Sequence, residues 1–140
     1  MPTRGMSLQN PCNIMHNPNF TWNGEVVPTS DPQGRLCQFD SILDGIRAGA
    51  KNILAAYRLH GCDTMTKLIT RLSPPNENDT AAYIKFMCQE CGVDPDAVID
   101  FTDPSLLRVT CRSIIRQEQG YWAGVGYDVL AQGVDEALAG

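Results

Sequence analysis

One carboxylate near the end of an apolar helical stretch is the residue best placed to do chemistry in this chain. Glu118 follows the run Ser113 to Gln117 and precedes Gly120, so we expect it in the last turn of a buried helix. An acid that protonates a glycosidic oxygen must be held rigidly, partly shielded from water and open to a cleft, and such a helix end meets these demands. The spacing therefore predicts Glu118 as a general acid. A surface glutamate beside a helix cap explains the same spacing and stays open as the structural alternative.

A glycan-cleaving site also needs groups that raise the pKa of the acid and stabilise the charge that develops on the sugar. The aromatic pair Tyr121 and Trp122, directly after the helix, is predicted to desolvate Glu118. A second carboxylate could come from Glu25 or Asp31 in the N-terminal segment. A route in which an acetamido group of the substrate stabilises the charge needs no second carboxylate, and both schemes stay open here.

Amide, aromatic and cationic side chains are the candidates for contacting a sugar. Amides suit hydroxyl and N-acetyl groups, an indole stacks on a sugar ring, and a tyrosine hydroxyl reaches a cleft from the core. The predicted substrate-binding set is Asn10, Asn13, Trp22, Arg47, Asn78 and Tyr83.

Several members of this set have structural alternatives. Trp22 also suits the role of a core anchor. Asn78 and Asp79 follow a Pro-Pro pair, and we favour a helix-capping turn over a binding role for them. Arg47 is expected either to pair with an acid, Glu118 included, or to stay in solvent.

The elements that must position these residues are predicted to be mainly helical. Residues 1–40 are rich in Asn, Pro and Gly without a sustained period, so they predict an irregular N-terminal wall that forms one side of a cleft. Residues 41–120 have the apolar spacing of a helical core, and residues 121–140 contain a C-terminal amphipathic helix. The predicted fold class is therefore mainly α, in a single domain of 140 residues.

Local start and stop signals predict the bounds of the helices. Serine or aspartate precedes four of the apolar runs as an N-cap, and glycine or proline follows several of them. The expected ranges, caps included, are Ser41 to Gly61, Asp63 to Pro74, Asp79 to Gly92, Asp103 to about Glu118, and roughly Tyr127 to Leu138.

Composition excludes several function classes. The formal net charge is −5 and the basic residues are dispersed, which argues against nucleic acid as a partner. No run of about 18 apolar residues is present to insert into a membrane. The first eight residues lack the apolar block of a secretory signal.

Cysteine and histidine spacing predicts neither a metal site nor a cofactor. Of the cysteines, only Cys88 and Cys91 are close in sequence, and His16 and His60 stand alone in different segments. Reduced, buried thiols and assembly in a cytoplasm are therefore expected. The six cysteines are Cys12, Cys37, Cys62, Cys88, Cys91 and Cys111.

Five short motifs occur in a fixed order along the chain: Gly5 to Ile14, Trp22-Asn23-Gly24, Gly45-Ile46-Arg47-Ala48, Pro74 to Tyr83, and Ile114 to Gly120. Together they resemble the motifs of a family of small phage and prophage virion proteins. The last of them is also similar to the run that carries the catalytic glutamate in lytic transglycosylases of the lysozyme superfamily.

The resemblance implies a lysozyme-like helical fold with Glu118 as general acid and base. It also implies a virion protein of the tail or baseplate, assembled in the host cytoplasm, whose partners are other virion proteins and peptidoglycan. The family pattern has an Asn triplet where this chain has Ser7 to Asn10, and a His-Glu-Asn-Gly tetrad where it has Gln117 to Gly120. Glu118 is retained, whereas amides and a histidine that could contact substrate are replaced.

These departures leave two functions open. The first is a virion-associated enzyme that degrades the glycan strand of peptidoglycan. The second is a non-catalytic virion structural protein that uses the same fold to join tail or baseplate components. A small effector of prophage descent is a third interpretation and would require an immunity partner.

Overall fold

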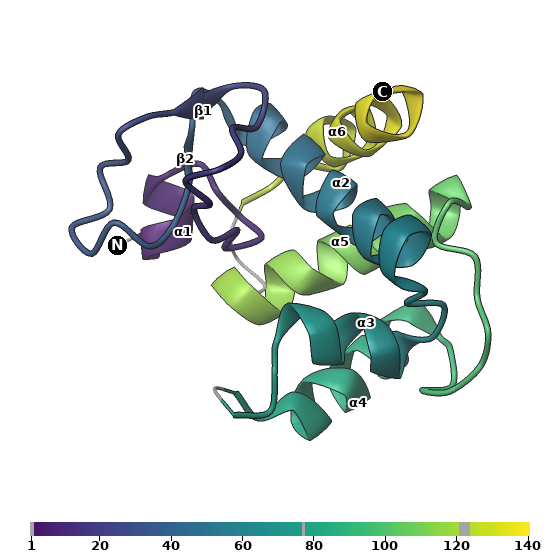
Figure 1. The fold of residues 1–140 in the computed structure, drawn as a ribbon. Coiled ribbons are helices and arrows are strands. Elements are labelled where there is room, and N and C mark those ends of the chain that lie inside the picture. Colours follow the sequence, from purple (N-terminus) through teal and green to yellow (C-terminus); the bar gives the residue numbers. More distant parts are fainter. Residues whose placement is uncertain (1, 77, 121–123) are drawn as a thin grey trace.

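A helical core organised around one long helix, with an irregular N-terminal segment packed beside it, makes up the structure (Figure 1). The computed structural model describes residues 2–76, 78–120 and 124–140. This part of the chain is mainly helical, as predicted. Its helices are α1 (Arg4–Ser7), α2 (Ile42–His60), α3 (Met65–Leu72), α4 (Thr80–Cys91), α5 (Pro104–Gln119) and α6 (Tyr127–Ala139).

Local capping chemistry sets most of the helix starts. The predicted caps Ser41, Asp79 and Asp103 each accept a bond from a backbone N–H in the first turn of their helices. The prediction for α3 is wrong by one residue, because Thr64 is its N-cap and accepts from the Lys67 N–H. Asp63 instead forms an ion pair with the Lys67 side chain at 3.0 Å.

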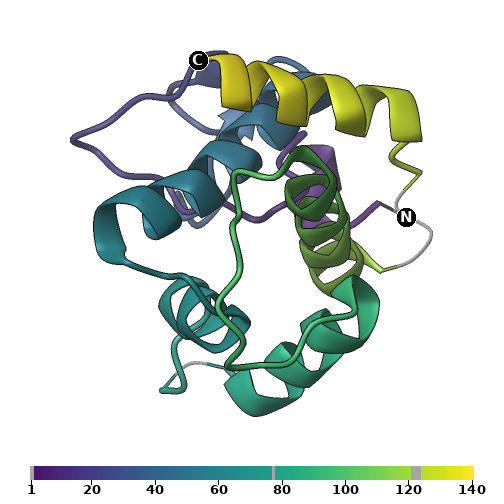
Figure 2. The ribbon, with the colours of Figure 1, turned by 90° about the vertical axis from the view of Figure 1, so that its right-hand side faces the viewer.

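The core fills the space between α2 and the helices that pack on it. α2 contacts α3, α5 and α6, and α4 packs against both α3 and α5 (Figure 2). The largest side chains in this core are fully buried, which gives it the dense apolar packing that stabilises small domains. They include Ile46, Ile53, Met65, Leu68, Met87, Phe101 and Leu107. Within the described residues, no helix is both long and apolar enough to cross a membrane.

The N-terminal wall, described from residue 2 to residue 40, is irregular, with α1 and a two-stranded sheet as its regular elements. Strands β1 (Glu25–Val26) and β2 (Gln38–Phe39) pair antiparallel. A small apolar cluster of Ile14, Cys37 and Phe39 lies beneath them and contacts Ala48 on α2. The wall is thus joined to the core through a second, smaller cluster.

Two glycines on α2 let the wall approach the helix closely. A methyl group at Gly45 would collide with the Gln9 carbonyl, and one at Gly49 would collide with the Cys12 thiol. They are four residues apart and therefore share one helical face. Residues 9–12 consequently lie directly against α2, which places the wall alongside the core (Figure 1).

Candidate active site

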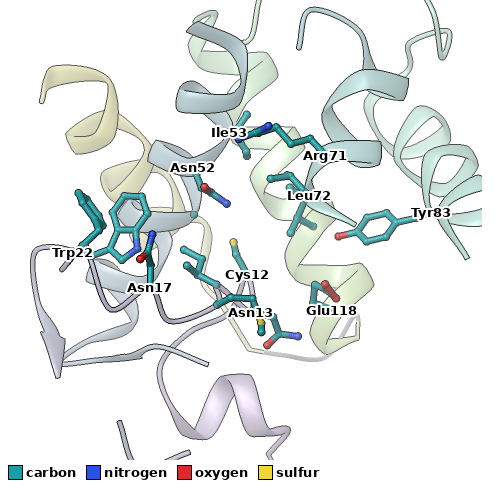
Figure 3. Close-up of a pocket in the computed structure, with 15 residues that line it drawn as sticks. Cys12, Asn13, Asn17, Trp22, Asn52, Ile53, Arg71, Leu72, Tyr83 and Glu118 are labelled. Atoms are coloured by element: carbon teal, nitrogen blue, oxygen red, sulfur yellow. The ribbon is translucent and has the colours of Figure 1, made fainter. Parts of the chain in front are cut away.

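A cleft of about 490 Å³ opens between the N-terminal wall and the helical core. The wall contributes its side chains on one flank, α3 and α4 contribute on the other, and α2 and α5 lie between them (Figure 3). Its volume lies within the usual range of small-molecule sites. The polar and aromatic residues that line it include Asn13, Asn17, Phe20, Trp22, Asn52, Arg71, Tyr83 and Glu118.

Glu118 projects into this cleft from the last turn of α5. Ile114, one turn earlier on the same face, also lines the cleft, while Ile115 is buried in the core and fixes the helix. The Glu118 side chain is half-buried, and this burial raises the pKa of its carboxyl group above the ordinary value. A hydrogen bond from the Asn13 amide opposes part of that shift, because it stabilises the charged form. The helix end thus holds an acid that retains its proton to higher pH than a solvated glutamate.

A chain of amides holds the acid in place. The Asn13 side chain bonds to Glu118 and accepts a 2.9 Å hydrogen bond from Gln119 Nε2. Gln119 Nε2 also donates to the Pro11 carbonyl at 2.9 Å, and the Thr3 hydroxyl donates to Gln119 Oε1. Asn13 has φ +52°, a left-handed conformation that asparagine tolerates better than most residues. These contacts tie the last two residues of α5 to the wall.

Tyr83 and Cys12 lie close enough to Glu118 to respond to its charge. Burial first, and the Glu118 carboxylate second, raise the pKa of the Tyr83 hydroxyl well above its ordinary value. The Cys12 pKa is raised by a contact with Cys111, whose sulfur is 4.0 Å away, by burial, and to a lesser degree by Glu118. Both groups therefore stay neutral beside the acid.

Three of the six predicted substrate-binding residues join Glu118 in the cleft: Asn13, Trp22 and Tyr83. Trp22 packs partly against the wall cluster and contacts Phe20 edge-on, with ring centroids 4.7 Å apart. It therefore serves as an anchor and as part of the cleft surface at once.

The other three predicted residues lie elsewhere. Asn10 is fully buried, and its amide bonds the backbone of Ile14 and Cys37. Arg47 faces α6, with its guanidinium beside Gly140. Asn78 is exposed and donates to the Pro74 carbonyl in the turn before α4. None of the three lines the cleft, so we omit them from the site.

The groups expected to support the acid also lie elsewhere. Asp31 accepts backbone hydrogen bonds from Arg35 and Leu36 within its own loop, and these bonds lower its pKa. The Glu25 carboxylate bonds His16 and the Trp22 N–H inside the wall. Among the described residues that line the cleft, Glu118 is the one carboxylate. The predicted aromatic neighbours, residues 121 and 122, lie outside the described residues.

Asn52 and Arg71 line the cleft but were absent from the predicted site. Asn52 shares a face of α2 with Gly49 and Ile53, so a polar residue interrupts an otherwise small and apolar stripe. That interruption is a signal that sequence reasoning could have used. Arg71 lies in the last turn of α3 and is exposed. Cations are common near helix C-termini, so its position in the sequence does not indicate a binding site.

Comparison with known proteins relates the chain to a phage protein. No protein-family model matches it. It is similar to Protein P5 of Pseudoalteromonas phage PM2, with 33% identity over 108 residues. The aligned region covers 74% of this chain and 66% of that protein, so the chain spans just under two thirds of the length of this relative. The similarity supports the expected phage relationship, while lysozyme-like catalysis stays a prediction.

Proposed function

We propose that the chain is a phage virion protein that cleaves the glycan strand of peptidoglycan, with Glu118 as general acid and base. The observation that carries the proposal is a half-buried carboxyl group with a raised pKa at the surface of a cleft. Similarity to a protein of phage PM2 supports the phage assignment. Amide and aromatic side chains around the acid support a carbohydrate as the substrate.

In the first step, Glu118 donates its proton to the glycosidic oxygen as the bond from that oxygen to the anomeric carbon breaks. Burial favours the protonated form of the acid beforehand, and the Asn13 hydrogen bond stabilises the carboxylate that the transfer leaves. The carboxylate then serves as a base for the attacking hydroxyl group. Asn13 thus favours the proton donation of the first step, while burial, which raises the pKa, favours the uptake of a proton in the second step.

A single carboxylate favours a transglycosylase-type route. Retaining and inverting glycosidases use a second carboxyl group about 5 to 9.5 Å from the acid. Neither Glu25 nor Asp31 lines the cleft, because each is bonded within the wall. We infer that the substrate acetamido group stabilises the positive charge and that a hydroxyl group of the same sugar attacks. The product is then lighter by one water than a product of hydrolysis.

Different sides of the cleft offer different groups for binding the substrate. Trp22 and Phe20 offer aromatic surface for a sugar ring, and Asn17 and Asn52 offer amides for hydroxyl and acetamido groups. Arg71 is exposed at the cleft, where it can contact the carboxylates of the stem peptides of peptidoglycan. An uncharged glycan such as chitin lacks these carboxylates, so we expect peptidoglycan to be preferred.

Digestion of purified peptidoglycan tests this proposal. Wild type, Glu118→Gln and the control Glu136→Gln are incubated with it, and released fragments are identified by mass. Glu136 is exposed on α6 and does not line the cleft, so its variant matches the chemical change without touching the site. We expect wild type and the control to release anhydro fragments and Glu118→Gln to release none. Equal release by all three folded proteins would contradict the role of Glu118.

A non-catalytic virion structural role is the second candidate, and one observation favours it. Met15 and Phe20 are each 50% exposed where they line the cleft, and such apolar side chains also suit a protein partner. If folded wild type releases no fragments, whereas Phe20→Ser and Met15→Ser prevent its incorporation into phage particles, the structural role replaces the enzymatic one. A tail or baseplate location stays a prediction under either function.

A further inference from the structure

An imidazole, a carboxylate and a thiol meet inside the N-terminal wall, outside the cleft. The ligand atoms of His16, Glu25 and Cys37 all lie within 4.8 Å of one another. His16 Nδ1 is 3.0 Å from Glu25 Oε2. Sequence spacing predicted an isolated histidine and no metal site, because the three residues share no short motif. The fold brings them together.

Strand pairing and backbone hydrogen bonds bring the three residues together, so their positions do not depend on contacts between their side chains. Glu25 begins β1, and Cys37 immediately precedes β2, so the pairing of the two strands sets their separation. The Cys37 N–H donates to the Ile14 carbonyl at 2.9 Å, and the His16 N–H donates to the Arg35 carbonyl at 2.7 Å. These bonds align residues 14–16 antiparallel to residues 35–37, which lead into β2. The cluster is therefore preorganised by the wall itself.

We propose that His16, Glu25 and Cys37 bind a zinc-class divalent ion. Zinc takes nitrogen, oxygen and sulfur ligands at about 2.0 to 2.3 Å, which places tetrahedral ligand atoms roughly 3.3 to 3.7 Å apart. His16 Nδ1 and Glu25 Oε2 are 3.0 Å apart, slightly closer than this range, so they must move apart a little. All ligand atoms of the cluster lie within 4.8 Å of one another, so any pair that exceeds the range must move closer by about 1 Å at most. Three protein ligands leave the fourth position for water or another donor.

Charge and burial fit such an ion. The Glu25 side chain is 1% exposed, and Cys37 is fully buried. Buried charges need compensation, and a divalent cation held by one carboxylate, one thiolate and one neutral imidazole forms a centre without net charge. His16 is 27% exposed in its side chain, which gives the ion a path from solvent. A thiol ligand excludes magnesium and calcium, which prefer oxygen donors throughout.

The bound ion would brace one side of the cleft. The second oxygen of Glu25, Oε1, accepts a 3.0 Å hydrogen bond from the Trp22 N–H. Carboxylates that bind a metal ion usually accept a further hydrogen bond, which fixes their orientation. Because the Trp22 side chain lines the cleft, the ion fixes the backbone that carries it. This inference stands whether or not the cleft cleaves glycan.

Cobalt titration tests the site directly, since Co²⁺ occupies zinc sites and absorbs light when bound to thiolate. Full-length reduced protein is freed of metal with a chelator, titrated with Co²⁺ and then with Zn²⁺. We expect a near-ultraviolet thiolate-to-cobalt band that saturates at one equivalent and disappears when Zn²⁺ displaces Co²⁺. Zinc is expected to raise the melting temperature, because it binds the folded state.

Four variants separate this cluster from other thiols and histidines. Cys37→Ala should abolish the band, and His16→Gln, which removes a ligand, should weaken Co²⁺ binding by more than the roughly 10- to 100-fold that loss of an outer partner costs. The controls Cys62→Ala and His60→Gln change a buried cysteine and an exposed histidine outside the cluster, and they should bind as wild type does. His16 is partly exposed, so its variant stays informative even if Cys37→Ala fails to fold.

Two results would overturn the metal site. One is folded wild-type protein that gives no band with Co²⁺ and no change of melting temperature with Zn²⁺. The other is wild-type affinity in folded His16→Gln, or an undiminished band in folded Cys37→Ala. In either case the cluster is a hydrogen-bonded contact that stabilises the wall.

Discussion

The helical core and the N-terminal wall are held together by different interactions. Apolar side chains such as Phe101 and Met87, both fully buried, pack the helices of the core. The wall has a small apolar cluster and relies on buried polar groups, with Asn10 bonding Ile14 and Cys37 and Asp31 closing its own loop. Packing tolerates small shifts by local relaxation, whereas hydrogen bonds depend on precise geometry. The wall is therefore the region in which one substitution should have the most local effect.

The cleft depends on both regions because its residues are divided between them. The core supplies Glu118 and Tyr83, and the wall supplies Asn13 and Trp22. Gln119 connects the two through its bonds to Pro11 and Asn13. We therefore expect some substitutions to unfold the whole chain, and others to detach the wall and leave the core folded.

The largest expected effect is on the core. Phe101 is fully buried and contacts Tyr57 edge-on with centroids 5.9 Å apart, so Phe101→Ala removes a large side chain and leaves a cavity. We expect a loss of about 4 kcal/mol in the free energy of unfolding. Chemical denaturation should show a single transition for the whole protein. Stability equal to that of wild type would contradict the central place of Phe101 in the core.

The next largest effect is confined to the wall. Asn10→Ala leaves the Ile14 N–H and the carbonyls of Ile14 and Cys37 without their side-chain partner. We expect a loss of about 2 to 3 kcal/mol, because buried polar groups lose their compensation. Hydrogen exchange should accelerate in residues 8–39 and stay slow in α4 and α5. Uniform acceleration in both regions would show that the wall and core unfold together.

The junction between the two regions is tested by Gly45→Ala. The added methyl group collides with the Gln9 carbonyl, which belongs to the backbone and cannot rotate away. A loss of about 2 kcal/mol is expected from this overpacking. The control is Gly126→Ala, because Gly126 has open space around its position and a negative φ. Gly61 is unsuitable, because its φ of +66° would strain an alanine. Equal stability of Gly45→Ala and Gly126→Ala would contradict close docking of the wall.

The smallest effect concerns the pH dependence of stability. Burial raises the folded-state pKa of Glu118, so the folded protein binds this proton more tightly than the unfolded chain does. The resulting stability is fully present below the unfolded pKa, near 4.5, and is lost as the pH rises through the folded pKa. Denaturation of wild type and Glu118→Gln should therefore show the variant gaining relative stability with rising pH. The same curves are recorded for the exposed control Glu136→Gln, and a Glu118→Gln variant that differs from wild type by the same amount at every pH would contradict the prediction.

Helix bounds were predictable because caps and stop residues act over a few residues. Ser41 and Asp103 cap their helices as expected, while the cap of α3 shifted because Thr64 also carries a suitable oxygen. The apolar spacing of α5 placed Glu118 in the last turn of the helix, whereas the cleft in front of it is formed by residues from several segments and could not be predicted. The helix bounds and the position of Glu118 in the last turn depend on local sequence.

Features that depend on tertiary contacts were not predictable. Asn10 is a structural residue because its amide meets backbone from Cys37, which is 27 positions away. Arg47 faces α6 because α2 is covered on several sides, and its apolar pattern does not reveal which side opens to the cleft. His16 and Cys37 meet through strand pairing that their spacing does not encode.

A crystal structure of Glu118→Gln with a peptidoglycan glycan fragment tests the central claim most directly, since the variant binds the glycan without cleaving it. We expect sugar rings between Trp22 and Tyr83, with a glycosidic oxygen within hydrogen-bonding distance of residue 118. Glycan bound at another surface, or a cleft free of glycan in crystals grown at a saturating concentration, would contradict the claim that wall and core together form a glycan-cleaving site.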